Sequence, residues 1–455
     1  MSKTPSFPTL LLLLLSLVML TNCRQGTSAS GGSWQAGSGR EKITPPAGLW
    51  MTGYAARDRP ADGTAQDLWV KALAFADPAG NRGVLLTLDL CGVHRELSDE
   101  VAAELGRRFK LPRSAVLVNV SHTHCSPMLG GYLMGLRILP PDGQQKADAY
   151  TRDLKEKMIR AGAAALDSLA PAEIAWGEDA ATFGFNRREN AEKDAPALRA
   201  AGKLKGPFDP RVPVLAVRDA GGALKALLIS YACHNTTLAF FQWHGDYAGS
   251  AQAELERRHP GATVLFAIGC GADINPGPRR ELAHAEQHGR DLADAADRAL
   301  ARPMTRVEGK FTSALEDITL TFASRPTEEK LREAREKNQP NKEMHQAWSA
   351  AVTELFRAKG DQAMNQSYPV QAWTLGGLTW AALGGEVVID YSLRLRAELG
   401  NNLWVFGYSN DVMAYIPSER VLKEGRYEGD TSMVPYGKPG PWSPGLEEKN
   451  RGQDT

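Results

Sequence analysis

Residues 115–125 read Ala-Val-Leu-Val-Asn-Val-Ser-His-Thr-His-Cys, an apolar run that ends in two histidines. The run at 115–120 predicts a buried strand, because strands covered on both faces are almost continuously hydrophobic. On extended chain, His122 and His124 would point to the same side. Imidazole is a common zinc ligand, and a strand end holds side chains at a fixed spacing. The pair therefore indicates a metal site, although His-x-His runs also occur as ordinary polar strand ends.

Further apolar runs predict strands that alternate with helices. The predicted strands are residues 69–75, 82–89, 212–218, 225–231, 263–268 and 370–380. The predicted helices are residues 99–109, 150–169, 249–258 and 282–301. This mixture predicts an α/β fold in which mixed β-sheets are flanked by helices. Because no linker divides the chain, we expect a single large catalytic domain at residues 41–444 and a polar tail at 445–455.

The composition limits the possible partners. The 455-residue chain has 53 lysines and arginines and 53 aspartates and glutamates, so its formal net charge is zero. A nucleic-acid-binding protein normally carries a basic surplus, so we expect no nucleic-acid partner. The hydrophobic fraction of 43% and the charged fraction of 23% are typical of a globular protein.

The N-terminus predicts an exported protein. Lys3 and the apolar run at 10–20 predict a signal peptide over residues 1–23, since the run is short for a membrane span. Leu20-Thr21-Asn22-Cys23 resembles a bacterial lipobox, which implies a lipid anchor on Cys23 and membrane association. Ordinary secretion with cleavage near Ala29 is the alternative. The Gly/Ser-rich residues 24–40 predict a flexible linker.

Two other features leave alternatives open. Cys91, Cys125, Cys233 and Cys270 could form disulfides in an exported protein, with three possible pairings, but we favour small buried packing residues. Residues 326–363 are strongly polar and helical. They predict either a lid over the site or, as the favoured interpretation, a solvated helical hairpin that decorates the domain.

Two more segments carry candidate ligands. His234 follows the apolar run at 226–232, although a single histidine in such a place is usually a core or turn residue. Glu386 lies within an apolar segment, and a buried carboxylate needs a partner such as a metal ion. Residues 266–276 predict a strand that runs into a glycine-rich turn, where backbone can approach a ligand closely.

In this order, these segments resemble the catalytic domain of neutral, non-lysosomal ceramidases. The resemblance extends over about residues 43–429 and begins with Met-Thr-Gly-Tyr-Ala at 51–55 and Trp-Val-Lys-Ala-Leu at 69–73. In that family, one zinc ion activates water to hydrolyse the amide between a fatty acid and a sphingoid base. The resemblance therefore implies an exported zinc-dependent amidohydrolase that acts on ceramide or a related N-acyl lipid.

The resemblance also implies the roles of the metal-site residues. His122 and His234 match the two zinc histidines, and Glu386 matches the carboxylate ligand. Tyr415 matches the tyrosine near the metal, which we expect to be an additional ligand. His124 matches the histidine treated as the general base.

The remaining matched residues would contact the substrate or orient other groups. Tyr427 matches the tyrosine that contacts the reacting carbonyl. Arg187 is similar to the substrate-binding arginine, with Arg188 as the alternative one position away. We expect Asp273 to orient one of these groups. Asn275 stands where the family carries a serine, so contacts to the substrate headgroup should differ, while hydrolysis by metal-activated water needs no serine.

Three other functions compete with this interpretation. One is a related zinc hydrolase acting on a different N-acyl or ester substrate, which is favoured by Asn275 and by our expectation that the family's C-terminal β-sandwich is missing. Another is a cysteine hydrolase that uses Cys125 beside His124. The last is a non-catalytic lipoprotein that binds lipids or glycans.

Overall fold

The computed structural model describes residues 33–131, 139–338 and 340–447. The predicted signal peptide, the proposed anchor Cys23 and the alternative cleavage near Ala29 lie outside the described residues. Among the helices that are described, none combines the length and the apolar character needed to cross a bilayer.

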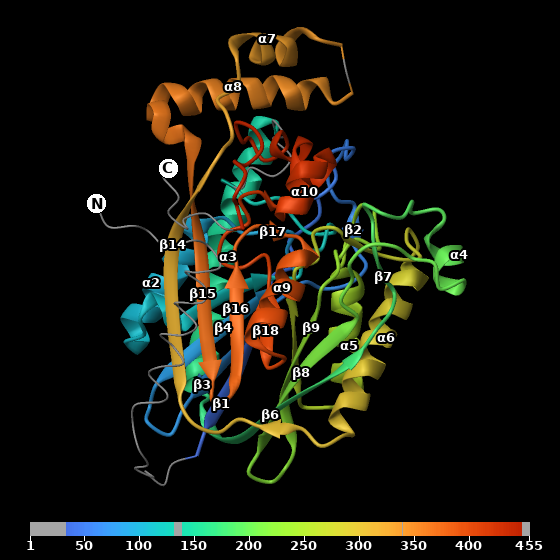
Figure 1. Cartoon of the computed structure of the whole chain (residues 1–455). Coiled ribbons are helices and arrows are strands. Elements are labelled where there is room, and N and C mark those ends of the chain that lie inside the picture. Colours follow the sequence, from blue (N-terminus) through green and yellow to red (C-terminus); the bar gives the residue numbers. More distant parts are fainter. Residues whose placement is uncertain (1–32, 132–138, 339, 448–455) are drawn as a thin grey trace, which may run out of the picture.

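A nine-stranded mixed sheet forms the centre of the molecule (Figure 1). Its strand order is β11-β9-β8-β6-β1-β3-β4-β5, and β13 pairs with β6. The strands are β1 (Gln35–Lys42), β3 (Trp69–Ala76), β4 (Arg82–Leu88), β5 (Val116–Val120), β6 (Ala170–Ala180), β8 (Arg211–Asp219), β9 (Leu224–Tyr231), β11 (Thr263–Ile268) and β13 (Thr305–Arg306). Most pairs are antiparallel, while β4 with β5 and β9 with β11 are parallel.

A second sheet of four strands packs beside the first. Its order is β14-β15-β16-β18, with β14 (Phe311–Thr321), β15 (Asn365–Leu375), β16 (Leu378–Leu383) and β18 (Leu403–Phe406). Phe75 of β3 and Trp380 of β16 meet edge to face, with ring centroids 5.9 Å apart, so the core runs between the two sheets. Three short pairs complete the strands: β2 (Gly63–Thr64) with β10 (Gln242–Trp243), β7 (Gly184–Asn186) with β12 (Ile274–Pro276), and β17 (Glu386–Val387) with β19 (Tyr415–Ile416).

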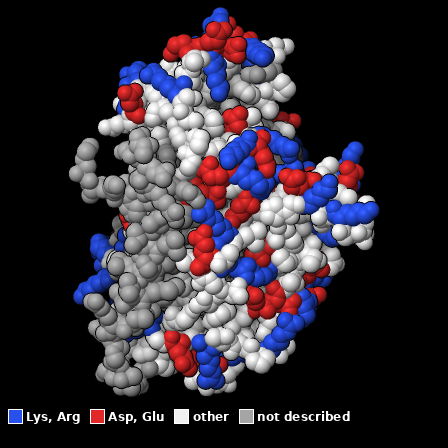
Figure 2. Space-filling view, in the orientation of Figure 1, with Lys and Arg blue, Asp and Glu red and all other residues white. Residues whose placement is uncertain are grey.

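Helices flank the sheets, which confirms the predicted α/β class (Figure 1). The helix α3 packs on β1 and β3, and α6 packs on β6, β8 and α5. The helices are α2 (Arg95–Phe109), α3 (Pro141–Asp167), α4 (Ala195–Ala200), α5 (Asp246–Arg258), α6 (Leu282–Leu300), α7 (Glu328–Glu336), α8 (Lys342–Lys359), α9 (Ile389–Leu399), α10 (Glu419–Glu424) and α11 (Arg426–Gly429). Three 3-10 turns are η1 (Arg113–Ala115), η2 (Gly360–Met364) and η3 (Thr431–Met433). Basic and acidic side chains are interspersed over the visible face, in keeping with the zero net charge (Figure 2).

The carboxyl ends of three strands meet in one place. β9 and β11 lie side by side, whereas β5 lies at the opposite end of the strand order. The side chain of Asn119 in β5 nevertheless accepts a hydrogen bond of 2.9 Å from the backbone N–H of Ile268 in β11. Segments that follow β5, β9 and β11 are thereby brought together, at the edge where α/β folds usually bind ligands.

The predicted flexible linker is wrong over residues 35–40. These residues belong to β1, which pairs with β3 along its whole length. The glycines there serve close packing: a Cβ on Gly37 would lie 2.3 Å from the carbonyl oxygen of Ala165, and one on Gly39 would lie 2.2 Å from that of Ala161. The sequence pattern was misleading because small residues under a helix have the same composition as a tether. The domain also continues past residue 444, since Leu446 is buried.

The polar segment 326–363 forms the two helices α7 and α8, inserted between the adjacent strands β14 and β15 (Figure 1). We call residues 328–359 the α7–α8 hairpin. It has a small apolar core of its own, which includes Leu331, Trp348 and Phe356. Trp348 also donates a hydrogen bond of 2.7 Å from its indole N–H to the carbonyl of Lys438. The hairpin is therefore a packed element attached to the C-terminal segment.

All four cysteines in the described residues are buried, and none of these four forms a disulfide. This agrees with the interpretation of Cys91, Cys125, Cys233 and Cys270 as small packing residues. They lie in segments that converge on one region, which is described next.

Candidate metal centre

His122, His234 and Glu386 come together in the interior, although they lie far apart in the sequence. Glu386 Oε2 is 3.2 Å from His122 Nε2 and 3.2 Å from His234 Nε2. The two Nε2 atoms are 3.3 Å apart. All three side chains are at most 1% exposed. Two imidazole nitrogens and one carboxylate oxygen therefore form an almost equilateral triangle.

This triangle fits a divalent metal such as zinc. A tetrahedral zinc site with ligand bonds of about 2.0–2.1 Å has ligand–ligand edges of about 3.3–3.4 Å. The three edges of the triangle lie within about 0.2 Å of that range. Another potential group combines Cys91 with His122 and His124, but Cys91 Sγ is 3.7 Å from His122 Nδ1, which already bonds to backbone. The triangle is thus the better-formed site.

Backbone carbonyls set the orientation of both imidazoles. His122 Nδ1 donates to the carbonyl of Cys91 at 2.5 Å, and His234 Nδ1 donates to that of Gly271 at 2.9 Å. Because a carbonyl oxygen can only accept, each ring carries a proton on Nδ1, and its Nε2 faces the triangle. Such outer hydrogen bonds are usual for metal-bound histidines.

Three tyrosines surround Glu386. Tyr436 donates a short hydrogen bond from its hydroxyl to Glu386 Oε1, which leaves Oε2 facing the histidines. The hydroxyl of Tyr408 lies 3.4 Å from Oε2. Tyr415 is the register partner of Glu386 in the parallel pair β17–β19, and its hydroxyl is 3.4 Å from His234 Nε2. Tyr415 is therefore placed where a further ligand would approach.

The local backbone differs from the expected extended chain. β5 ends at Val120, and His122 has a left-handed φ of 59°. The argument that His122 and His124 share one side of a strand is therefore wrong, yet their Nε2 atoms are 3.1 Å apart. The turn, rather than strand alternation, brings the two rings together. A left-handed non-glycine residue at such a place stores strain and is often associated with function.

His124 is held by its surroundings against the edge of the cluster. Arg57 donates to its backbone carbonyl at 2.8 Å, and the ring of Tyr54 packs edge-on with centroids 4.6 Å apart. Gly53 lies directly against the imidazole, because a Cβ there would be 2.3 Å from His124 Cγ. The ring thus has little freedom to move away from His122.

Arg187 rather than Arg188 reaches the site. Its guanidinium donates to Tyr415 Oη at 3.2 Å, to Asn275 Oδ1 at 3.3 Å and to Glu428 at 2.7 Å. Arg188 instead forms ion pairs with Glu424 and Glu428.

Asp273, Asn275 and Tyr427 lie around Arg187. The carboxylate of Asp273 accepts a hydrogen bond of 2.9 Å from the backbone N–H of Ile389. The backbone carbonyl of Asp273 accepts a hydrogen bond of 2.9 Å from the backbone N–H of Arg187. Asp273 therefore ties the arginine segment to α9 instead of touching the triangle. Tyr427 is 45% exposed and packs edge-on against Tyr415. Its catalytic role stays a prediction, as do those of the other residues around the triangle.

The electrostatics of His234 and Glu386 suit metal ligation. Burial lowers the pKa of His234 to about 4, and the charge of Arg187 acts in the same direction. Burial and the neighbouring His122 hold the pKa of His124 well below its usual value. Burial opposes ionisation of Glu386, but the charges and hydrogen bonds of His122 and His234 outweigh it and keep the pKa of Glu386 well below normal. Neutral His234 and ionised Glu386 are in the protonation states that a metal requires. Burial opposes protonation of His122, but Cys91 and Glu386 raise the pKa of His122 to about 10, so a metal ion would have to displace a proton from this ring.

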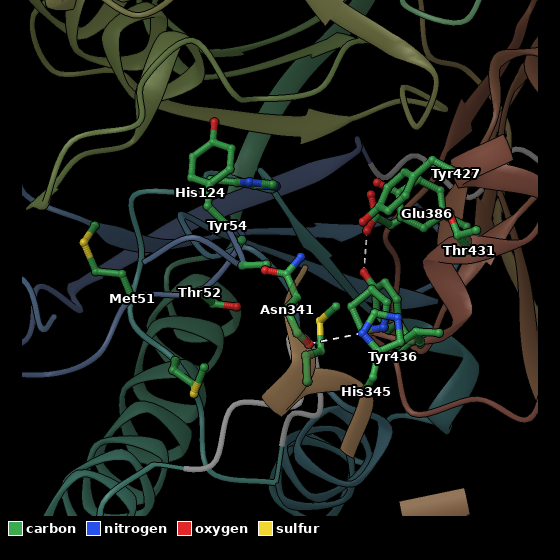
Figure 3. A pocket seen from close by; sticks show the side chains of 17 residues that line it. Met51, Thr52, Tyr54, His124, Asn341, His345, Glu386, Tyr427, Thr431 and Tyr436 are labelled. Carbon is green, nitrogen blue, oxygen red and sulfur yellow. Dashed lines mark hydrogen bonds between the residues drawn. The ribbon is translucent and has the colours of Figure 1, made fainter. Parts of the chain in front are cut away.

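A pocket of about 320 Å³ opens onto the cluster (Figure 3). We call it the inner pocket. Its walls include His124, Glu386 and Tyr427, together with Met51 from the N-terminal segment. The α7–α8 hairpin supplies Asn341, Met344 and His345 to the same wall. The hairpin therefore does more than decorate the domain, because it forms part of this pocket.

Several residues of the site were missed by sequence reasoning. Tyr436 lies within the predicted domain but outside every motif that was recognised, so its contact with Glu386 had no local signal. The packing role of Gly53 was missed, although its segment carried part of the family resemblance. Met344 was missed because a polar helix gives no sign of which face meets a pocket.

A fold with a buried two-histidine, one-carboxylate cluster at its strand ends defines a class of proteins whose cleft has side chains that could hold a metal ion. The particular family follows from a sequence comparison. The profile described as "Neutral/alkaline non-lysosomal ceramidase, N-terminal" matches residues 34–271, and the chain belongs to this family of hydrolases.

Curated relatives and solved structures agree with this assignment. The chain is 26% identical over 261 residues to neutral ceramidase 2 of Arabidopsis thaliana, which covers 55% of this chain and 32% of that protein. It is 31% identical over 192 residues to a neutral ceramidase of Oryza sativa subsp. japonica, covering 41% and 23%. The matches thus span a third or less of these relatives. A crystal structure of neutral ceramidase from Pseudomonas aeruginosa has a similar fold, with a TM-score of 0.69 and 19% identity over 91% of this chain and 72% of that one.

Proposed function

We propose that this protein is a zinc-dependent amidohydrolase that cleaves the N-acyl amide of ceramide or a related lipid. The observation that carries the proposal is the triangle of His122, His234 and Glu386, whose edges match those of a tetrahedral zinc site. Tyr415 would approach as an additional ligand. A bound zinc ion would polarise the substrate carbonyl and lower the pKa of water at the site.

The side chains around the triangle would carry out the proton transfers. His124 is neutral, and its Nε2 lies at the edge of the cluster, so it can take a proton from the attacking water. It would then deliver this proton to the leaving amine. Tyr427 and Arg187 would donate to the negative oxygen that develops in the transition state. Arg187 stays charged, because Tyr415 and Glu428 hold its pKa well above normal against the effect of burial.

The methionine side chains that line the inner pocket support a lipid-like substrate. Met51, Met128 and Met344 line it, and methionine side chains adapt to apolar ligands of varying shape. Asn275 is engaged with Arg187, so the headgroup contacts of a serine at this position would be replaced by those of an amide. A different N-acyl or ester substrate is therefore the main alternative within the same chemistry.

The decisive experiment is an assay of zinc-loaded protein on ceramides and other N-acyl compounds, with and without a chelator. We expect hydrolysis that the chelator abolishes and added zinc restores. His122→Ala should abolish both zinc binding and hydrolysis, whereas His259→Ala, a surface histidine paired with Asp297, should abolish neither. Full activity of His122→Ala, or purified protein that binds no zinc, would refute the proposal.

The other two candidate functions receive less support. Burial raises the pKa of Cys125 to about 12, so its thiol stays protonated and is a poor nucleophile. A non-catalytic lipid- or glycan-binding lipoprotein would not require His124 to be positioned beside the metal ligands. Zinc-bound protein that hydrolyses none of the N-acyl compounds would favour this binding function.

We also propose that the protein is exported and anchored to a membrane through a lipid on Cys23. The support is the sequence of residues 1–23 alone. Mass spectrometry of the mature N-terminus should find a lipid-modified cysteine, and Cys23→Ala should release the protein from the membrane fraction. A mature chain that begins near Ala29 would instead indicate secretion without an anchor.

A further inference from the structure

A second hollow adjoins the inner pocket. Its volume is about 1020 Å³, and we call it the α8 groove. One wall is formed by Met344, Ala347 and Ala350 of α8, and the opposite wall includes Trp50 and Leu139. Arg57, Asp58, Glu343 and Gln346 are among its polar residues. The lining is thus mostly apolar, with some charged and polar groups among it.

The two hollows share a boundary. Ala55, Asn341 and Met344 line both the inner pocket and the α8 groove. A molecule that reacts at His124 and Glu386 in the inner pocket could therefore continue into the groove past Met344. Beyond it, Ala347 and Ala350 follow at intervals of three residues, which places them along the same side of the helix. Their small side chains leave the groove open.

We propose that the α8 groove binds a hydrocarbon chain of the substrate and that Met344 separates this subsite from the reaction centre. The proposal rests on the proposed amide hydrolysis and names the part of the substrate that the hairpin recognises. Two sources share this chemistry, because the chain can belong to the acyl group or to the amine of an N-acyl lipid. In either case the groove selects substrates whose chain is long enough to pass Met344.

Burial of the chain should appear as a dependence of specificity on its length. Each methylene that leaves water contributes up to about fourfold to binding. In wild-type protein, kcat/KM should therefore rise with chain length once the chain passes Met344. Ala347→Trp fills the groove with an indole, so the ratio of kcat/KM for long-chain over short-chain substrates should fall toward one. Ala350→Trp, farther along the groove, should act only on longer chains.

The matched control is Ala358→Trp, at an exposed position of α8 outside the groove. This variant should keep the wild-type ratio. Two substrate series, one varied in the acyl chain and one in the amine, identify which chain enters the groove. The proposal is overturned if neither Ala347→Trp nor Ala350→Trp changes the ratio in either series.

Binding measured without turnover separates this proposal from the proposed function. Brominated fatty amides of increasing chain length should quench the fluorescence of Trp50 in metal-free protein, and Trp50→Phe should remove that part of the quenching. If no N-acyl compound is hydrolysed but quenching still depends on chain length and on Ala347→Trp, the subsite stands and the reaction is wrong. If quenching depends on neither, the subsite is refuted whatever the enzyme hydrolyses.

Discussion

Gly53 determines where the imidazole of His124 can lie. It has a φ of 97°, and any Cβ would overlap the ring. Gly53→Ala should therefore displace His124 and lower kcat by about 10²-fold or more, the usual contribution of a general base. Zinc content should stay near wild type. Gly48→Ala is the matched control, because Gly48 has a φ of 92° and open space around it, so this change strains the backbone without touching a catalytic group.

Tyr436 orients the proposed carboxylate ligand. Its hydroxyl donates to Glu386 Oε1, so Oε2 is directed at the two histidines. Tyr436→Phe should weaken zinc binding by about 10–100-fold, as other outer hydrogen bonds to metal ligands do. Competition with a chromogenic chelator measures this directly. Tyr150→Phe, which removes a buried hydrogen bond to the carbonyl of Ile43, should leave zinc affinity unchanged.

Asp273 gives a prediction for pH. Burial raises the pKa of this carboxyl to about 6, although hydrogen bonding to Ile389 opposes the shift. The folded state therefore binds a proton more tightly than the unfolded state, and the resulting stability is lost as the pH rises from about 4 to above 6. Asp273→Asn has no such proton. Its free energy of unfolding relative to wild type should improve between pH 5 and pH 8 by about 1.4 kcal/mol, as measured by denaturant titration. A pH-independent difference would contradict this.

At the scale of elements, two glycines of β1 allow this strand to pack closely against α3. A Cβ on Gly39 would lie 2.2 Å from the carbonyl oxygen of Ala161, and the helix backbone cannot move away from it without a cost in free energy. Gly39→Ala should lower the free energy of unfolding by about 1–3 kcal/mol, which is the usual cost of overpacking. Gly63→Ala in β2 is the control, because its Cβ would meet only the side chain of Gln242 at 3.6 Å. Equal stability of the two variants would show that β1 and α3 can separate.

The sequence predicted elements well wherever periodicity determines them. Continuous apolar runs located β3, β4, β5, β8, β9 and β11 to within one or two residues. Helix starts were less accurate, since α3 begins at Pro141 rather than residue 150. The first turns of α3 are polar and carry no apolar periodicity. β1 was missed because its glycines are needed for close packing against α3, which lies about 120 residues away in the chain. No local sequence pattern reveals this requirement.

The candidate site was predicted in composition but not in geometry. Histidine and glutamate at the ends of apolar runs identified the chemistry, and the family resemblance assigned the roles. The left-handed turn at His122 and the hydroxyl of Tyr436 depend on how distant segments pack. Such features cannot be deduced from spacing alone.

At the scale of the whole molecule, the metal should act as a stabilising ligand. Of its proposed ligands, His122 follows β5, His234 follows β9 and Glu386 lies in β17. A bound ion therefore links distant parts of the chain. Zinc at 100 times its Kd should add about 2.7 kcal/mol to the free energy of unfolding. Calorimetry should find a higher Tm with zinc than after chelation, and Glu386→Gln should remove most of this difference. An identical Tm in both states would mean that no ion binds the folded centre.

The way in which the α7–α8 hairpin is attached has a consequence for how the sequences of homologous proteins can diverge. β14 and β15 remain paired up to Thr321 and Asn365, so the hairpin leaves and rejoins the domain at neighbouring points about 5 Å apart. Its length and composition can change without altering the register of any strand. If homologous proteins exchanged this hairpin, the surface that recognises the substrate would change, while the residues that carry out the reaction would stay the same.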